Sequence, residues 1–151
     1  MQRTASSLLA IVLLVVGIAA AAQAPGTFAT ARERWQSAAA EDYRYSYRKY
    51  CDCNKDEPPL TVVSVSGGRI ERVYHVHNDS AREVPAREGS LDLYWTIDDL
   101  FDKLETATAA GAVVRAEFDD ADGYPLRLFI DYNAEFAGDE TDLREITLER
   151  F

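Results

Sequence analysis

The sequence predicts an α+β fold in which two helix-β-β-β units form one largely antiparallel sheet with two helices on one face. Two segments place apolar residues at helical spacing, and six segments have the composition or the period-two alternation of strands. Short connections between successive strands favour antiparallel neighbours. Because each helix is apolar on one side only, both are expected to cover one face of the sheet. The other face is left to solvent or to a partner.

The first unit is predicted to begin with a helix over 28–40, where Trp35 and several alanines recur at helical spacing. From Asp42 the period changes to two, and the tyrosines that follow suit a strand. Gly67-Gly68 is a two-residue hairpin signal. We therefore expect three strands and two connections in this unit: strands over 42–51, 60–66 and 69–77, a turn over 54–59, and a long polar connection over 78–90.

The second unit repeats this order. Thr96 is a natural helix N-cap, and Asp98 and Asp99 follow in the first turn, where the helix dipole favours carboxylates. Gly111 stands where a residue with positive φ ends a helix. The apolar stripe of this helix is Ile97, Leu100, Phe101, Leu104 and Ala107. Three strands are expected after it, over 112–118, 126–131 and 143–150.

Composition limits the class of protein. The chain has 151 residues, 26 acidic against 16 basic, a net charge of −10 and two cysteines. This size predicts one domain, over 28–151, after a short linker over 23–27. Phosphate recognition needs clustered basic residues, so the charge argues against a nucleic-acid partner. Two cysteines exclude a disulfide-dense scaffold.

The N-terminus has the layout of a secretory signal peptide over 1–22. Arg3 precedes a 15-residue apolar run from Leu8 to Ala22 that ends in small residues. A membrane-spanning helix needs about 20 residues. Cleavage is predicted after Ala22, with a signal anchor as the alternative. The expected product is an exported protein, periplasmic or extracellular, with no membrane span after cleavage.

Two pairs of residues could carry chemistry. Cys51 and Cys53 are two apart, and in an oxidising compartment they are candidates for a disulfide bond. Such a bond would serve as a structural clip or in redox catalysis. A metal-linked role, free thiols and an intermolecular link are the alternatives for this pair. His75 and His77 are also two apart, on one predicted strand. If the two strands were adjacent, four ligands for zinc or copper could converge. The spacing matches no known zinc finger, so no cofactor is predicted.

Tyr43, Tyr45 and Tyr47 share one face of the first predicted strand. Tyrosine is enriched at the energetic centres of interfaces, so this stripe could bind a partner. It could equally form the sheet face under the helices. The sequence shows neither a Ser-His-Asp set nor an obvious acid-base pair of carboxylates, and we expect no enzyme.

The sequence resembles an exported bacterial family that is catalogued as domain of unknown function 6174. The resemblance covers roughly residues 30–149, and the family brings no known activity. It is carried by Trp35, Asp42-Tyr-Arg-Tyr45, Cys51-Asp-Cys53, Thr96-Ile-Asp-Asp-Leu-Phe101, Gly123-Tyr-Pro125 and Asp131. The arrangement is also similar to that of β-lactamase-inhibitor-like and PepSY-like envelope domains, and that second likeness implies architecture alone.

The expected function is that of a non-catalytic binding module of the cell envelope. Its open sheet face would hold a protein or peptide partner, and the module itself is expected to be a monomer. The alternative is a small metal-handling or thiol-redox protein that uses Cys51 and Cys53 with His75 and His77.

Overall fold

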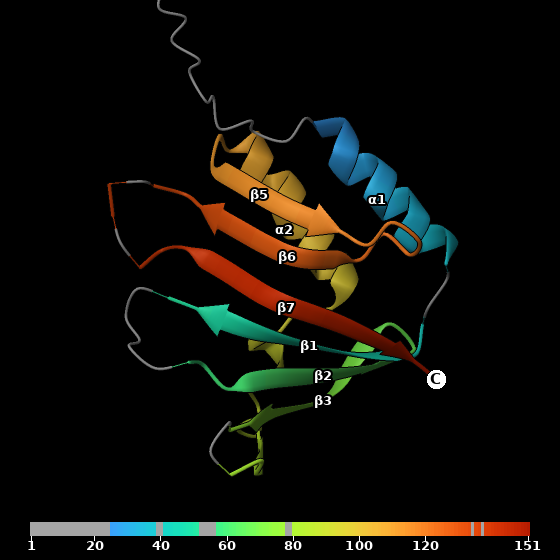
Figure 1. Cartoon of the computed structure of the whole chain (residues 1–151), viewed down its shortest axis with the longest axis vertical. Helices are drawn as coiled ribbons and strands as arrows, with labels where there is room; N and C mark the ends of the chain where they lie inside the picture. Colours follow the sequence, from blue (N-terminus) through green and yellow to red (C-terminus); the bar gives the residue numbers. More distant parts are fainter. Residues whose placement is uncertain (1–24, 39–40, 52–56, 78–79, 134, 137) are drawn as a thin grey trace, which may run out of the picture.

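The computed structural model describes residues 25–38, 41–51, 57–77, 80–133, 135–136 and 138–151. These residues form one seven-stranded sheet in the order β4-β3-β2-β1-β7-β6-β5, with every neighbouring pair antiparallel (Figure 1). The α+β prediction is therefore confirmed. The elements are α1 (Pro25–Ser37), β1 (Tyr43–Tyr50), β2 (Leu60–Ser66), β3 (Arg69–Val76), β4 (Glu83–Pro85), the 3-10 helix η1 (Leu91–Leu93), α2 (Ile97–Ala109), β5 (Val113–Phe118), β6 (Pro125–Asp131) and β7 (Thr141–Arg150).

Two of these elements differ from the sequence-based expectation. Helix α1 begins at Pro25, inside the predicted linker, because proline has the φ angle of a first helical turn and no N–H group to satisfy there. Strand β4 lies inside the predicted connection over 78–90 and gives the sheet a seventh strand. It is a three-residue edge strand that ends in Pro85, so it shows no alternation to detect.

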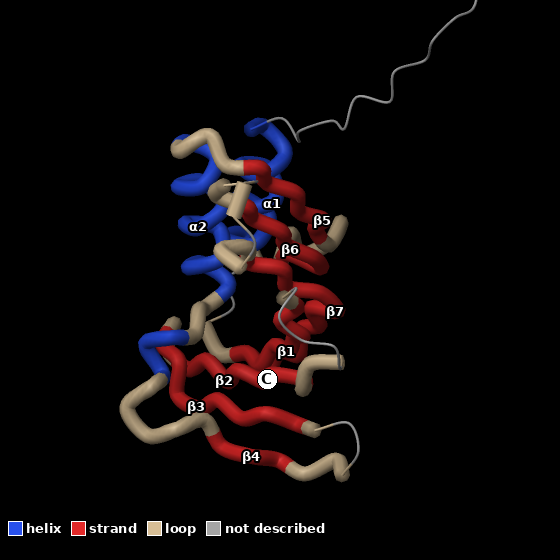
Figure 2. Tube along the Cα trace, turned by 90° about the vertical axis from the view of Figure 1, so that its left-hand side faces the viewer, coloured by secondary structure: helices blue, strands red, loops and turns tan. Residues whose placement is uncertain are grey.

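Both helices lie on one side of the sheet, beside β5, β6 and β7, whereas η1 lies beside the other half (Figure 2). The two halves meet where β1 pairs with β7, the first strand of one unit with the last strand of the other. Helix α1 contacts β1 through Trp35 and packs against the β5–β6 turn of the other unit. Helix α2 contacts β5 and β6, which belong to its own unit. Both units begin with a helix, but only α2 lies mainly on strands of its own unit.

Gly123 brings the β5–β6 turn against α1. This residue is buried and has a φ of +79°, a backbone conformation that suits glycine. A Cβ atom at this position would overlap the carbonyl oxygen of Ala31 and would lie 2.9 Å from the Cβ of Arg34. The missing side chain is thus what lets the helix and the turn touch.

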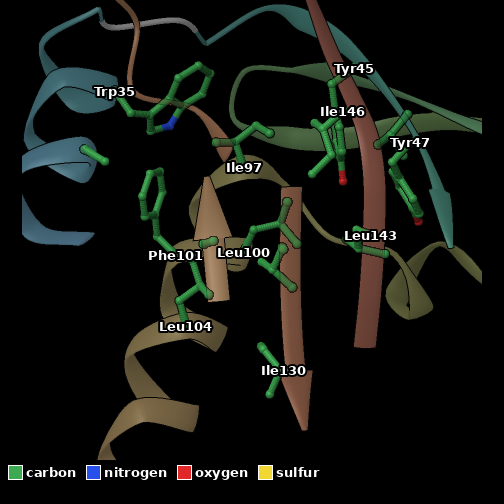
Figure 3. Close-up of a cluster of buried hydrophobic side chains, with 14 of the residues drawn as sticks. Trp35, Tyr45, Tyr47, Ile97, Leu100, Phe101, Leu104, Ile130, Leu143 and Ile146 are labelled. Carbon is green, nitrogen blue, oxygen red and sulfur yellow. The ribbon is translucent and has the colours of Figure 1, made fainter. Parts of the chain in front are cut away.

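The core fills the space between the helices and the sheet (Figure 3). Trp35 of α1 meets Tyr43 of β1 edge to face, with 5.2 Å between ring centroids. Phe101 of α2 stacks on Phe118 of β5 at 5.7 Å. The predicted stripe of α2 is buried along its whole length. Among the described residues, no helix has the length and the apolar composition needed to cross a membrane.

Helix α2 begins with the predicted cap. The Thr96 side chain accepts a hydrogen bond from the backbone N–H of Asp99, and the Asp99 carboxylate accepts one from the backbone N–H of Thr96. This capping box satisfies two N–H groups that a helix start leaves without partners. The N–H of Ile97 donates to the hydroxyl of Tyr43 at 3.0 Å, which fixes the start of α2 on strand β1.

Candidate functional site

The tyrosine stripe lies under the helices. Tyr43, Tyr45 and Tyr47 are 1%, 1% and 3% exposed, and the hydroxyl of Tyr45 donates to the carbonyl oxygen of Trp95. Burial raises the pKa of Tyr43 to about 12, because the charged form would lose its hydration. The interpretation of these three side chains as a partner-binding surface was wrong, since all three are buried in the core.

The even-numbered residues of β1 point to the opposite, open face. On this face, arginines of β1 form ion pairs with glutamates of β7. Arg44 lies 2.7 Å from Glu149, and Arg48 lies 3.1 Å from Glu145. Surface pairs of this kind contribute little to stability, about 0–1 kcal/mol each. They do leave this part of the open face with balanced charge.

The open face of β5, β6 and β7 is different. Here a hollow of about 440 Å³ is lined by Arg115, Glu117, Arg127, Phe129, Asp142 and Arg144, with Ala116. Phe129 is half-buried and lies opposite both Arg115 and Asp142 in the sheet register. The Arg115 guanidinium lies 5.5 Å from the centre of the Phe129 ring. We call these six charged and aromatic residues the arginine face.

The three arginines of this face are not equivalent. Arg144 makes an ion pair with the buried carboxylate of Asp142, with its Nε 2.9 Å from Oδ2. Arg115 and Arg127 are exposed, and within the described part of the chain neither forms an ion pair. The Arg115 guanidinium therefore lies beside an aromatic ring, and Arg127 lines the same hollow opposite Glu117 in the sheet register. A guanidinium binds a carboxylate through two parallel hydrogen bonds, so this geometry suits an acidic ligand.

The two histidines of the predicted pair lie in different surroundings, because β3 ends between them at Val76. His75 is half-buried, with Nδ1 3.1 Å from the hydroxyl of Thr61 and Nε2 3.0 Å from the hydroxyl of Tyr94. Burial, and then the charge of His77, lower the pKa of His75 below its ordinary value. His77 follows the strand and is exposed. Both ring nitrogens of His75 are thus engaged with hydroxyl groups.

Of the predicted cysteine pair, the structure describes Cys51. Cys51 is half-buried just after β1, and Cys53 lies outside the described residues. The bond between them stays a prediction. Over the described residues, no three His, Cys, Asp or Glu side chains gather as a metal would require.

Sequence reasoning missed the arginine face. The period-two pattern of 112–118 and 126–131 did carry a signal, since Arg115 and Glu117 alternate with Val114 and Ala116. The register across β5, β6 and β7 was not readable. Only that register brings Arg115 beside Phe129, and Phe129 beside Asp142.

These features define a single-sheet α+β protein with one face covered by helices and one open face that carries arginines. The chain belongs to the family of unknown function DUF6174, whose family model matches residues 27–150. The resemblance drawn from the sequence is thereby confirmed. A comparison with curated proteins gave no match, and neither did a comparison with solved structures.

Proposed function

We propose that this protein is a non-catalytic binding module of the cell envelope that holds an acidic segment of a partner protein on its arginine face. The observation that carries the proposal is the exposed guanidinium of Arg115 beside the half-buried ring of Phe129, with exposed Arg127 lining the same hollow. Neither arginine forms an ion pair with another described residue. Arginine and aromatic side chains dominate the energetic centres of interfaces, so a face that combines them is suited to binding.

The charge of the chain supports an acidic partner segment over a basic one. The net charge is −10, so a basic partner would find attractive surface in many places. The arginine face carries three arginines against Glu117 and Asp142, and Arg144 already neutralises Asp142. An acidic segment would gain two charge-assisted contacts there. Elsewhere it would meet a surface of its own sign, and this contrast gives specificity.

A labelled peptide of alternating glutamate and valine tests this proposal. We expect saturable binding by fluorescence anisotropy, weakened at least tenfold by Arg115→Glu/Arg127→Glu, since each lost charge-assisted hydrogen bond contributes about 1.5–3 kcal/mol. The control Arg82→Glu/Arg87→Glu makes the same change of charge at exposed positions outside the arginine face. Equal weakening by both double variants would reject the site, because it would show a response to net charge alone. A lysine-valine peptide that bound as tightly would reject the acidic partner.

Export is part of the same proposal. The basic N-terminus and the apolar run to Ala22 support cleavage after that residue. The intact mass of the exported chain should correspond to a start at Gln23. A membrane-bound chain that retained Met1 would instead identify a signal anchor.

A disulfide bond between Cys51 and Cys53 completes the proposal. An oxidising compartment favours it, and non-reducing mass spectrometry should find the exported chain two hydrogens lighter than its reduced form. Two alkylatable thiols or a covalent dimer would contradict it. Because the loop is tiny, removing both cysteines should change the free energy of unfolding by about 0–3 kcal/mol.

A further inference from the structure

A second cavity lies on the helix side of the sheet, away from the arginine face. It encloses about 320 Å³, where β1 ends and β2 begins, and the segment between η1 and α2 forms one wall. That wall supplies Leu93, Tyr94 and Trp95, while the sheet supplies His75 and Lys49. Leu93 is 68% exposed, so an apolar side chain stands at the rim with little protein around it.

The polar side of this cavity is held in place by internal hydrogen bonds. The imidazole of His75 links the hydroxyl of Thr61 to that of Tyr94, and the rings of His75 and Tyr94 are 6.0 Å apart. These contacts orient Tyr94 without any ligand. A cavity whose walls are already fixed loses less entropy when a ligand enters.

Among the described residues that line the cavity, Lys49 is the one that carries a full charge. Lys49 is exposed and has its ammonium group 5.5 Å from the centre of the Trp95 ring. Within the described part of the chain it forms no ion pair, and no acidic residue lines this cavity. Lys103 contacts the same ring at 4.3 Å but lines the adjoining cavity, where Asp99 and Asp102 are also present.

We infer that this cavity binds a carboxylate with an aromatic or branched apolar body. The apolar body would contact Leu93, Tyr94 and Trp95, and the carboxylate would accept a hydrogen bond from the ammonium of Lys49. The size of the cavity and the position of Lys49, which has no ion pair with the described residues, both fit such a ligand. This site is separate from the arginine face and does not depend on the proposed function.

Trp95 gives a direct readout. The chain has two tryptophans, and Trp35→Phe leaves Trp95 as the fluorescent one. Phenylacetate is the probe. Phenylacetamide is the control that lacks the charge, and acetate is the control that lacks the ring. We expect a saturable change of Trp95 emission with phenylacetate. Binding should be about tenfold weaker with phenylacetamide, as expected for the loss of one charge-assisted hydrogen bond. Saturation-transfer NMR with the unsubstituted chain repeats the measurement should Trp35→Phe impair folding.

Lys49→Gln should weaken phenylacetate binding about tenfold and leave phenylacetamide binding unchanged, because only the charge-assisted contact is lost. Lys103→Gln is the matched control, since it removes the other cation on Trp95, and it should leave both affinities unchanged. Arg115→Glu/Arg127→Glu should also have no effect, so failure here is distinct from failure of the arginine face.

Acetyl-Gly-Phe and its amide distinguish the source of the ligand. Tighter binding of the free acid than of phenylacetate assigns the site to a peptide C-terminus, and the reverse assigns it to a small molecule. Equal affinity for phenylacetate and phenylacetamide, or no saturable change with either, would overturn the inference.

Discussion

The two faces of the sheet differ. One face is buried and stabilises the fold, and the other is exposed and carries the proposed binding site. Tyr43 and Arg44 are adjacent in β1, yet Tyr43 is buried under the helices and Arg44 forms an ion pair at the surface with Glu149. The same contrast holds in β6, where Leu128 is fully buried and its neighbours Arg127 and Phe129 belong to the arginine face. Because successive side chains of a strand point to opposite faces, one strand serves both purposes. Substitutions on the covered face should therefore affect folding, and those on the open face should affect ligands.

The sharpest test of this difference changes the same residue type on each face. Phe101→Ala on the covered face should lower the free energy of unfolding by about 3–5 kcal/mol, because it leaves a cavity in a core where this side chain is fully buried. Phe129→Ala on the open face should lower it by less than about half of that, since Phe129 is only half-buried. Urea unfolding measures both. Equal losses would contradict the division between the faces.

Gly123→Ala tests the contact by which α1 closes the covered face. The new Cβ would overlap Ala31, and the positive φ adds strain of its own. We expect a loss of about 2–5 kcal/mol, from about 1–2 for the backbone conformation and about 1–3 for overpacking. Gly68→Ala is the matched control, because φ is +71° there and no atom lies within 4 Å of the added Cβ. Thermal unfolding should rank Gly123→Ala well below Gly68→Ala.

Tyr43 makes the covered face sensitive to alkaline pH. Its pKa is about 12 in the folded chain, against an ordinary value of 10. Between about pH 10 and about pH 12 the unfolded chain loses this proton and the folded chain keeps it, so the free energy of unfolding falls as pH rises. Tyr43→Phe should make that fall shallower, while lowering stability at neutral pH by about 1–3 kcal/mol because the N–H of Ile97 loses its acceptor. Urea midpoints on either side of pH 10 measure the slope, and an unchanged slope would contradict the assignment.

Thr96→Ala tests the capping box where α2 meets β1. Removing the threonine oxygen leaves the N–H of Asp99 without its acceptor. The expected loss is about 1 kcal/mol, in the usual range for an N-cap. Thr96→Ser keeps that oxygen and should retain most of the stability in the same unfolding measurement. Similar losses for both variants would assign the effect to packing of the methyl group.

The smallest effect on folding is expected from the arginine face itself. Arg115→Glu/Arg127→Glu should change the free energy of unfolding by less than about 0.5 kcal/mol each, since both arginines are exposed and surface substitutions usually have small effects. The same double variant should abolish most binding of the acidic peptide. A large loss of stability would show that these arginines support the fold, and the two faces would then not be separate.

The second cavity adds a third kind of region. Tyr47 contributes to its lining and is itself a core residue, so the cavity borders the covered face and shares its rigidity. The arginine face lies on the other side of the sheet, where a hollow of about 440 Å³ carries three arginines. We therefore expect the cavity to select a ligand by its apolar body and one charge, and the arginine face to select one mainly by charge.

The sequence by itself determined both helices and six of the seven strands, and it determined which side of each helix is buried. The spacing of Trp35 and of the stripe from Ile97 to Ala107 predicted the buried sides of both helices, and Thr96 predicted where α2 begins. These are local properties, set by helical and strand periods and by backbone N–H groups that need partners within a few residues. Strand β4 was not predicted, because a three-residue edge strand is too short to show an alternating pattern of apolar and polar residues.

Only the tertiary structure decided which strands are neighbours and what covers each face of a strand. Alternation in β1 placed Tyr43, Tyr45 and Tyr47 together, but it could not say whether helices or solvent would cover them. The pairing of β1 with β7, and the register that joins Arg115, Phe129 and Asp142, depend on contacts between segments far apart in the sequence. Such contacts are fixed by the packing of the whole sheet, because moving a strand by one residue would reverse every side chain in it.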